Sequence, residues 1–129
     1  MITIGVNKLE QFFHENFSWE RLLDFFKQEN SYLKTRLSKV VDTNMDKDFL
    51  ALAEHFQNKF ILKDDLIDEL EHDLAEQRKR LDHYKTANTL PEEKISKAQQ
   101  RLRNEMEYIE KDFTSLKNEF NKYLLNIAK

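Results

Sequence analysis

The sequence predicts an all-α protein: three long antiparallel helices in a coiled-coil-like bundle, with a projecting two-helix hairpin arm and a short N-terminal helix. Two observations predict this class. Glycine and proline each occur once in 129 residues, at Gly5 and Pro91, whereas folds rich in strands or loops need many of both for their turns. Apolar residues also recur at alternating steps of three and four, which is typical of helices packed as in left-handed coiled coils.

The first 17 residues are expected to form a lead-in and a short helix. Ile2, Ile4 and Val6 alternate as in a strand, but no partner strand is expected, so we interpret residues 1–6 as an extended lead-in. Asn7, followed three residues later by Glu10, resembles a helix start. The short helix would carry Leu9, Phe12 and Phe13, and the extended lead-in is expected to pack on the bundle.

The first long helix is predicted over residues 18–42, with Asn16 or Ser18 as its N-cap. Its seam consists of Trp19, Leu23, Phe26, Asn30, Leu33, Leu37 and Val40. The second helix is predicted over residues 45–86, after a capping box of Thr43 and Asp46. Its seam consists of Phe49, Ala53, Phe56, Phe60, Lys63, Ile67, Leu70, Leu74, Gln77, Leu81 and Tyr84.

The third helix is predicted over residues 90–128, because Thr89 can cap it, Glu92 can complete the capping box and Pro91 falls in the first turn. Its seam consists of Ile95, Gln99, Leu102, Met106, Ile109, Phe113, Leu116, Phe120, Tyr123 and Ile127. All three helices are assigned to a single domain, residues 1–129.

The width of the apolar stripe predicts where the third helix is needed. Five further apolar residues widen the stripe early in the second helix, so this stretch must be covered from more than one side: Leu50, Leu52, Ile61, Leu62 and Leu66. Over residues 67–84 and 95–109 the stripe narrows to the seam. If the first helix folds back on the second, Trp19 reaches about residue 68. We therefore expect a two-helix arm over about residues 67–109, with its tip at residues 85–90.

A dimer of such hairpins, forming a four-helix bundle, is the rival geometry. Four polar residues occupy seam positions: Asn30, Lys63, Gln77 and Gln99. Polar seam residues commonly fix register or oligomeric state at some cost in stability. Equally, each can mark a place where the seam meets solvent. The sequence leaves both explanations open.

Composition narrows the function. A net charge of −3 with dispersed basic residues argues against nucleic-acid binding. The absence of cysteine removes disulfides and thiolate metal sites, and it favours a reducing compartment. With neither a secretory signal nor a membrane-spanning run, we expect a cytoplasmic protein. Glu69 and His72 match a di-iron ligand pair once, but the two other long helices lack histidine, so we expect no metal and no cofactor.

Charged residues and one aromatic residue are the partner-binding candidates. An acidic run in the second helix contains no Lys or Arg: Asp64, Asp65, Asp68, Glu69, Glu71, Asp73 and Glu76. We expect it to face Arg101, Arg103 and Lys111, either as charge matching between helices or as a docking surface for a basic partner. A basic patch is expected near the arm tip, from Arg78, Lys79, Arg80 and Lys97. Phe25, beside the seam, is the best candidate for an exposed aromatic contact.

One short motif suggests chemistry. His72-Asp73, followed by Gln77, resembles the phosphoacceptor box of one group of sensor histidine kinases. That resemblance implies a phosphate-accepting His72, with Asp73 as base and Gln77 as a positioning group, on the first helix of a dimerising hairpin. The sequence has no glycine-rich phosphate loop, so the resemblance implies a relay or an inhibitor, not a kinase.

These observations favour a non-enzymatic helical module for protein–protein interaction or scaffolding, which we expect to be a homodimer. The partner protein is unidentified. A histidine phosphotransfer or kinase-regulating hairpin centred on His72 is the alternative, and a metal- or cofactor-binding bundle is the second alternative.

Overall fold

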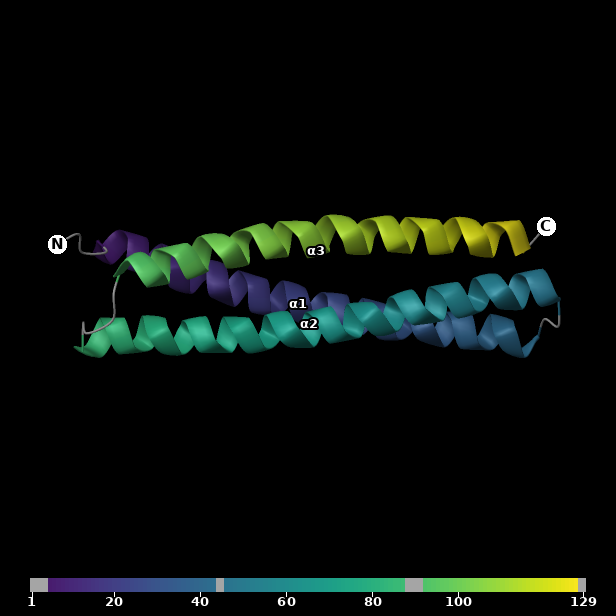
Figure 1. Ribbon diagram of the computed structural model, residues 1–129, viewed down its shortest axis with the longest axis horizontal. Helices are drawn as coiled ribbons and strands as arrows, with labels where there is room; N and C mark the ends of the chain where they lie inside the picture. The colour runs from purple at the N-terminus through teal and green to yellow at the C-terminus, as the bar shows by residue number, and fades with distance from the viewer. Residues whose placement is uncertain (1–4, 44–45, 88–91, 128–129) are drawn as a thin grey trace.

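Three long helices make up the chain in the computed structural model, which describes residues 5–43, 46–87 and 92–127. Helix α1 spans Val6–Asp42, α2 spans Lys47–Ala87 and α3 spans Glu92–Ile127. The prediction of an all-α protein is confirmed. Consecutive helices run in opposite directions, so α1 and α3 start at the same end of the molecule (Figure 1).

Helix α1 is continuous, and the predicted short N-terminal helix followed by a helix over residues 18–42 is wrong. The N-cap is Gly5, and Ser18 lies inside the helix. Asn16 is not a cap either, because its side chain is buried among the three helices. The seam in fact continues backwards from Trp19 through Asn16 to Phe12, in steps of three and four, so the same packing extends for another two turns.

The turn between α1 and α2 also differs from the predicted capping box. Thr43 closes α1: its backbone N–H and its hydroxyl both donate to the carbonyl oxygen of Val40. Asp46 caps α2, because its carboxylate accepts the backbone N–H of Asp48 at 2.9 Å. An aspartate at this position accepts a bond from an otherwise unpaired backbone N–H, and its negative charge interacts favourably with the positive end of the helix dipole. The cap predicted at Thr89 with Pro91 lies outside the described residues, as do residues 1–4 of the predicted lead-in. The predicted lead-in over residues 1–6 is too long, because Gly5 is the N-cap and Val6 the first residue of α1.

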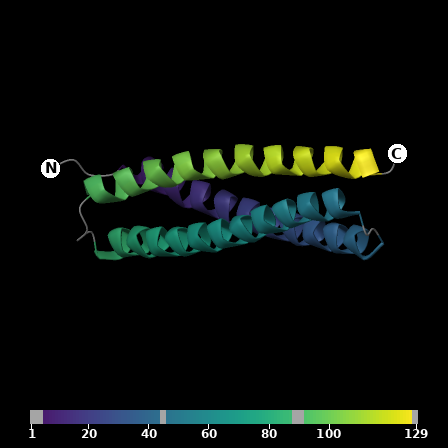
Figure 2. The same cartoon turned by 45° about the vertical axis from the view of Figure 1, so that its right-hand side comes forward.

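The predicted two-helix arm over residues 67–109 is also wrong, because α1 covers this part of the hairpin. Both views show α1 lying obliquely across α2, with its first turns beside the start of α3 (Figure 2). Phe12 is buried there with Leu81, Tyr84 and Ile95, in a small cluster of its own. The apolar stripe is narrow here because residues beside the seam contact α1 through ion pairs, as Arg78 does with Glu20 and Arg103 with Glu15, and not because a third helix is absent.

The main core fills the other two thirds of the bundle, and its aromatic residues gather near the α1–α2 turn. The ring of Phe56 lies 5.3 Å from that of Phe120 and 5.0 Å from that of Tyr123, measured between centroids. Phe60 meets Phe120 edge to face at 5.1 Å. Such pairs stabilise the fold beyond the area that they bury.

Part of the apolar stripe of α2 stays on the surface. We expected the added apolar residues to be covered from several sides, but Leu50, Leu52, Ile61 and Leu62 are exposed, and only Leu66 packs partly against the core. Two neighbouring helices contact α2 along its inner side, and residues turned away from both remain in solvent.

Candidate functional sites

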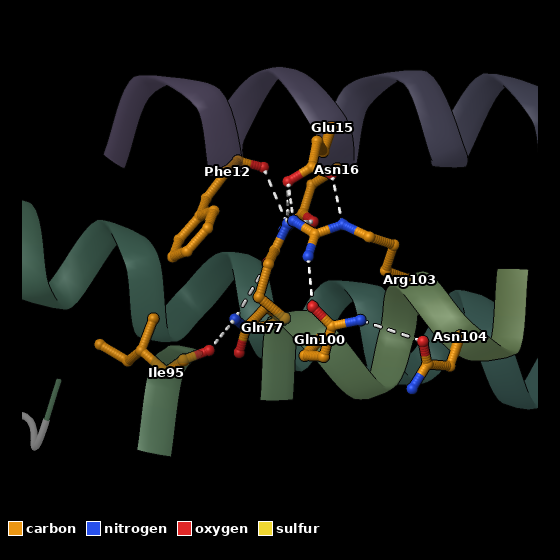
Figure 3. Close-up of polar contacts among 9 residues, drawn as sticks. Phe12, Glu15, Asn16, Gln77, Ile95, Gln100, Arg103 and Asn104 are labelled. Atoms are coloured by element: carbon orange, nitrogen blue, oxygen red, sulfur yellow. Dashed lines mark hydrogen bonds and ion pairs between the residues drawn. The ribbon is translucent and has the colours of Figure 1, made fainter. Parts of the chain in front are cut away.

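A buried polar layer joins the three helices one third of the way along the bundle (Figure 3). Gln77 of α2 donates from Nε2 to Oε1 of Gln99 on α3 at 3.1 Å and to the carbonyl oxygen of Ile95 at 3.0 Å. Gln99 in turn donates to Oδ1 of Asn16 on α1 at 3.1 Å. All three amides are at least 98% buried. This layer separates the small cluster around Phe12 from the main core.

A half-buried ion pair flanks the layer. Arg103 of α3 donates from Nε and Nη2 to the two carboxylate oxygens of Glu15 on α1, at 2.9 and 2.7 Å. The hydrogen bonds to Glu15, and then its charge, raise the pKa of the Arg103 guanidinium against the opposing effect of burial. The same guanidinium donates to Gln100, which donates to Asn104 (Figure 3).

These contacts can fix alignment but carry no reaction chemistry. The three amides can bond to one another only when α1, α2 and α3 are in one register. A shift of any one helix along its axis would therefore leave buried polar atoms without partners. Nδ2 of Asn16 already has no acceptor among the described residues. The structure therefore favours the register explanation for Gln77 and Gln99 over the solvent-contact explanation.

A second polar contact lies near the middle of the bundle. Asn30, fully buried on α1, donates to the carbonyl oxygen of Phe60 at 2.8 Å and to Oδ1 of Asp64 at 2.7 Å. Asp64 also forms an ion pair with Lys34. On the other side of α2, Lys63 is paired with Asp112 of α3. The polar seam residues thus occupy two levels, each bonded across helices.

The acidic run of α2 divides between the two neighbouring helices. On the α1 side, Asp68 and Glu71 lie 3.7 and 3.8 Å from Nζ of Lys27. The expected pairing with Arg103 is wrong, because Glu15 holds that side chain. The acidic residues on this side therefore form ion pairs between helices, mainly with lysines of α1.

The other half of the run faces α3. Burial, together with the nearby charges of Asp73 and Glu69, raises the pKa of Glu105, while Arg101 opposes the shift. Asp65 is exposed on the outer side of α2. This half remains accessible as an acidic surface.

The predicted phosphoacceptor lies in a shallow groove between α2 and α3. The lining includes His72, Asp73, Glu76, Arg80 and Arg101. His72 is exposed, as the resemblance requires. Gln77, however, is buried in the polar layer and does not line the groove itself. Its side-chain oxygen accepts a hydrogen bond from Arg80, which does line the groove, so the predicted positioning role stays a prediction. On a helix, residues five apart point in different directions.

The four basic residues predicted near the tip do not form a shared patch. Arg78 stacks on the ring of Phe17 at 4.7 Å and lies 3.5 Å from Glu20. Lys79, Arg80 and Lys97 contact residues of their own helices, which are Glu76, Gln77 and Glu93, respectively. The charges of Arg78, Lys79 and Lys97 are therefore balanced within the fold, whereas Arg80 is bonded to a neutral amide.

Exposed apolar residues are the remaining candidates. Phe25 is 53% exposed, as predicted for a contact residue. Sequence reasoning missed Tyr108 and Leu125, which are 63% and 65% exposed. The ion pair of Glu15 with Arg103 was also missed. Extending the seam of α1 back to Phe12 would have placed Glu15 beside that seam.

Comparisons with protein-family models, with curated proteins and with solved structures found no match. None of the described helices is apolar enough over a sufficient length to span a bilayer. Among residues 5–43, 46–87 and 92–127, no three His, Asp or Glu side chains gather as metal ligands would.

Proposed function

We propose that this chain is a non-enzymatic helical module for protein–protein interaction, and that it self-associates. The observation that carries the proposal is the set of large apolar residues left on the outside of α2 between residues 50 and 62. Single exposed apolar residues are normal on monomers, but a concentration of them on one element marks interaction surfaces. Because cysteine is absent, we place the module in a reducing compartment, the cytoplasm.

Light scattering across a concentration series tests this proposal. We expect a mass of twice the chain mass of 15.6 kDa, falling toward the chain mass on dilution. A mass of one chain at every concentration would contradict self-association. In that case the exposed acidic residues of α2 would be the surface to test with basic partner peptides.

A phosphotransfer role is the second candidate, because His72 and Asp73 share their groove with Arg80 and Arg101. Guanidinium groups bind phosphoryl oxygens well, and here they come from two different helices. Incubation with a small phosphodonor, followed by phosphate-affinity electrophoresis, should give an acid-labile adduct in the wild type. His72→Ala should abolish it, whereas His55→Ala, at another exposed histidine of α2, should not. An adduct that survives in His72→Ala would exclude this role.

A further inference from the structure

A groove runs along the side of the bundle where α2 and α3 meet, away from α1. Leu62 of α2 and Leu116 of α3 provide its apolar lining. Lys59, Ser115 and Glu119 line it as well. Leu62, at the rim of this groove, is 62% exposed.

Helical periodicity extends this groove into a longer apolar face. Residues seven apart lie on the same face of a helix, so Leu52 and Leu66 lie in line with Lys59 of the groove. By the same spacing, Tyr108 lies in line with Ser115. Leu52 is 50% exposed, Tyr108 is 63% exposed and Leu66 is partly buried. We call the surface formed by these rows and the groove the α2–α3 face.

The charges of the α2–α3 face are arranged by helix. The α2 side carries Lys59 and Lys63, and the α3 side carries Asp112 and Glu119. Lys59 lies 3.8 Å from Glu119, and Lys63 is paired with Asp112 at the adjacent turn. One side is therefore basic and the other acidic at the same height along the bundle.

This arrangement is complementary to itself under one kind of two-fold rotation. If the axis lies in the interface and runs parallel to the helices, α2 of one copy faces α3 of the other at the same height. The lysines of each copy then face the acids of the other, and Leu62 and Leu66 face α3. An axis perpendicular to the helices within the interface would instead set α2 against α2, with lysines facing lysines near the axis.

We infer that a second copy of this chain covers the α2–α3 face, in a two-fold dimer whose axis runs parallel to the bundle. The inference rests on the proposed self-association and assigns its surface and symmetry. The helices α2 and α3 of both copies form a four-helix layer, with α1 of each copy on the outside.

Spin labels attached to single cysteines test the surface and the axis separately, because the chain has no cysteine of its own. We choose three label positions that lie on one face of α3, fourteen and seven residues apart: Arg101→Cys, Ser115→Cys and Lys122→Cys. All three residues are exposed, and Ser115 also lines the groove. Ser31→Cys, exposed on α1, is the control. We expect similar distances between identical labels at the three α3 positions, all shorter than the distance at the control.

Each other outcome overturns a distinct statement. A wild-type protein that scatters light as a monomer contradicts both the dimer and this interface. A dimer with the shortest distance at Ser31→Cys retains self-association but refutes the α2–α3 face. Distances between identical labels that change by about 20 Å for each seven residues along α3 refute the parallel axis. Such a change is expected for an axis perpendicular to the helices, because each of the two labels then moves about 10 Å away from the axis.

A pair of matched substitutions provides a second test. Leu62→Glu should raise the dimer dissociation constant at least about tenfold, because a charge replaces a buried leucine at the interface. Leu125→Glu, at an equally exposed leucine of α3 outside the α2–α3 face, should leave the constant within about twofold. Both residues are exposed in the single chain, so helix content should not change. Equal effects of the two substitutions would overturn the inference.

Discussion

Arg103 on α3 holds both carboxylate oxygens of Glu15 on α1, at 2.9 and 2.7 Å, beside the buried amide of Gln99. The ion pair ties the first third of α1 to the start of α3, where apolar contact is limited to the small cluster around Phe12. Fork-like contacts of this kind are stronger and more directional than single ion pairs. The position of the α1 N-terminal third therefore depends on polar contacts more than the rest of the bundle does.

Arg103→Met should lower the free energy of unfolding by about 1–3 kcal/mol, since it leaves a half-buried carboxylate without its two guanidinium donors. Urea unfolding followed by circular dichroism measures the change. Arg101→Met is the matched control: its contact with Glu105 is a single exposed ion pair at 3.7 Å, and its loss should cost at most about 0.5 kcal/mol. Equal losses of unfolding free energy in the two variants would show that the contact with Glu15 stabilises the protein no more than an exposed ion pair does.

Gln99→Leu should destabilise the protein by about 1–3 kcal/mol, because the amides of Gln77 and Asn16 then lose their partner inside the bundle. Replacing all three amides with leucine removes every unpaired group together. We therefore expect the triple variant to be less destabilised than the sum of the three single variants, and to form several oligomeric species in light scattering. Strict additivity of the three losses would mean that the amides do not act as one unit.

The sequence was sufficient to predict an all-helical fold, because the steps of three and four between apolar residues determine which side of each helix is buried. Almost all predicted seam positions of α3 are buried. The extent of α1 was mispredicted for a related reason. Asn16 is polar and precedes Ser18, so it resembled a cap, whereas its amide is satisfied by Gln99 inside the bundle. Nothing in one helix alone indicates that a second helix will supply that partner.

The candidate sites were predicted less well, because they depend on pairing between helices. The sequence identified the acidic run, but its partner Lys27 lies about forty residues away, and only the fold places it beside Asp68. The direction of Gln77 could have been predicted, since it occupies a seam position while His72 does not. The seam position already predicts that the side chain of Gln77 points away from that of the exposed histidine.

Asp46→Ala should cost about 1 kcal/mol of stability, because the first turn of α2 then loses the acceptor for the N–H of Asp48. Thr43→Ala should cost clearly less, since its hydroxyl adds one exposed bond to a carbonyl that its own backbone N–H already reaches. Thermal unfolding of the two variants compares them directly. A larger loss for Thr43→Ala would restore the threonine as the capping residue.

Glu105→Gln should stabilise the protein at neutral pH, and the gain should vanish in acid. Burial and the charges of Asp73 and Glu69 raise the pKa of Glu105 in the folded state, so folding disfavours its ionised form. The penalty is therefore fully present above the folded pKa and is lost as the pH falls below the ordinary pKa of an unfolded glutamate. Glutamine removes the charge at every pH. The difference in midpoint temperature between variant and wild type should thus be positive at pH 7 and close to zero near pH 3. Glu119→Gln, at an exposed acid on the same face of α3 about four turns further on, provides the control. A gain that persists unchanged in acid would show that shape or helix propensity, not charge, makes Glu105 unfavourable.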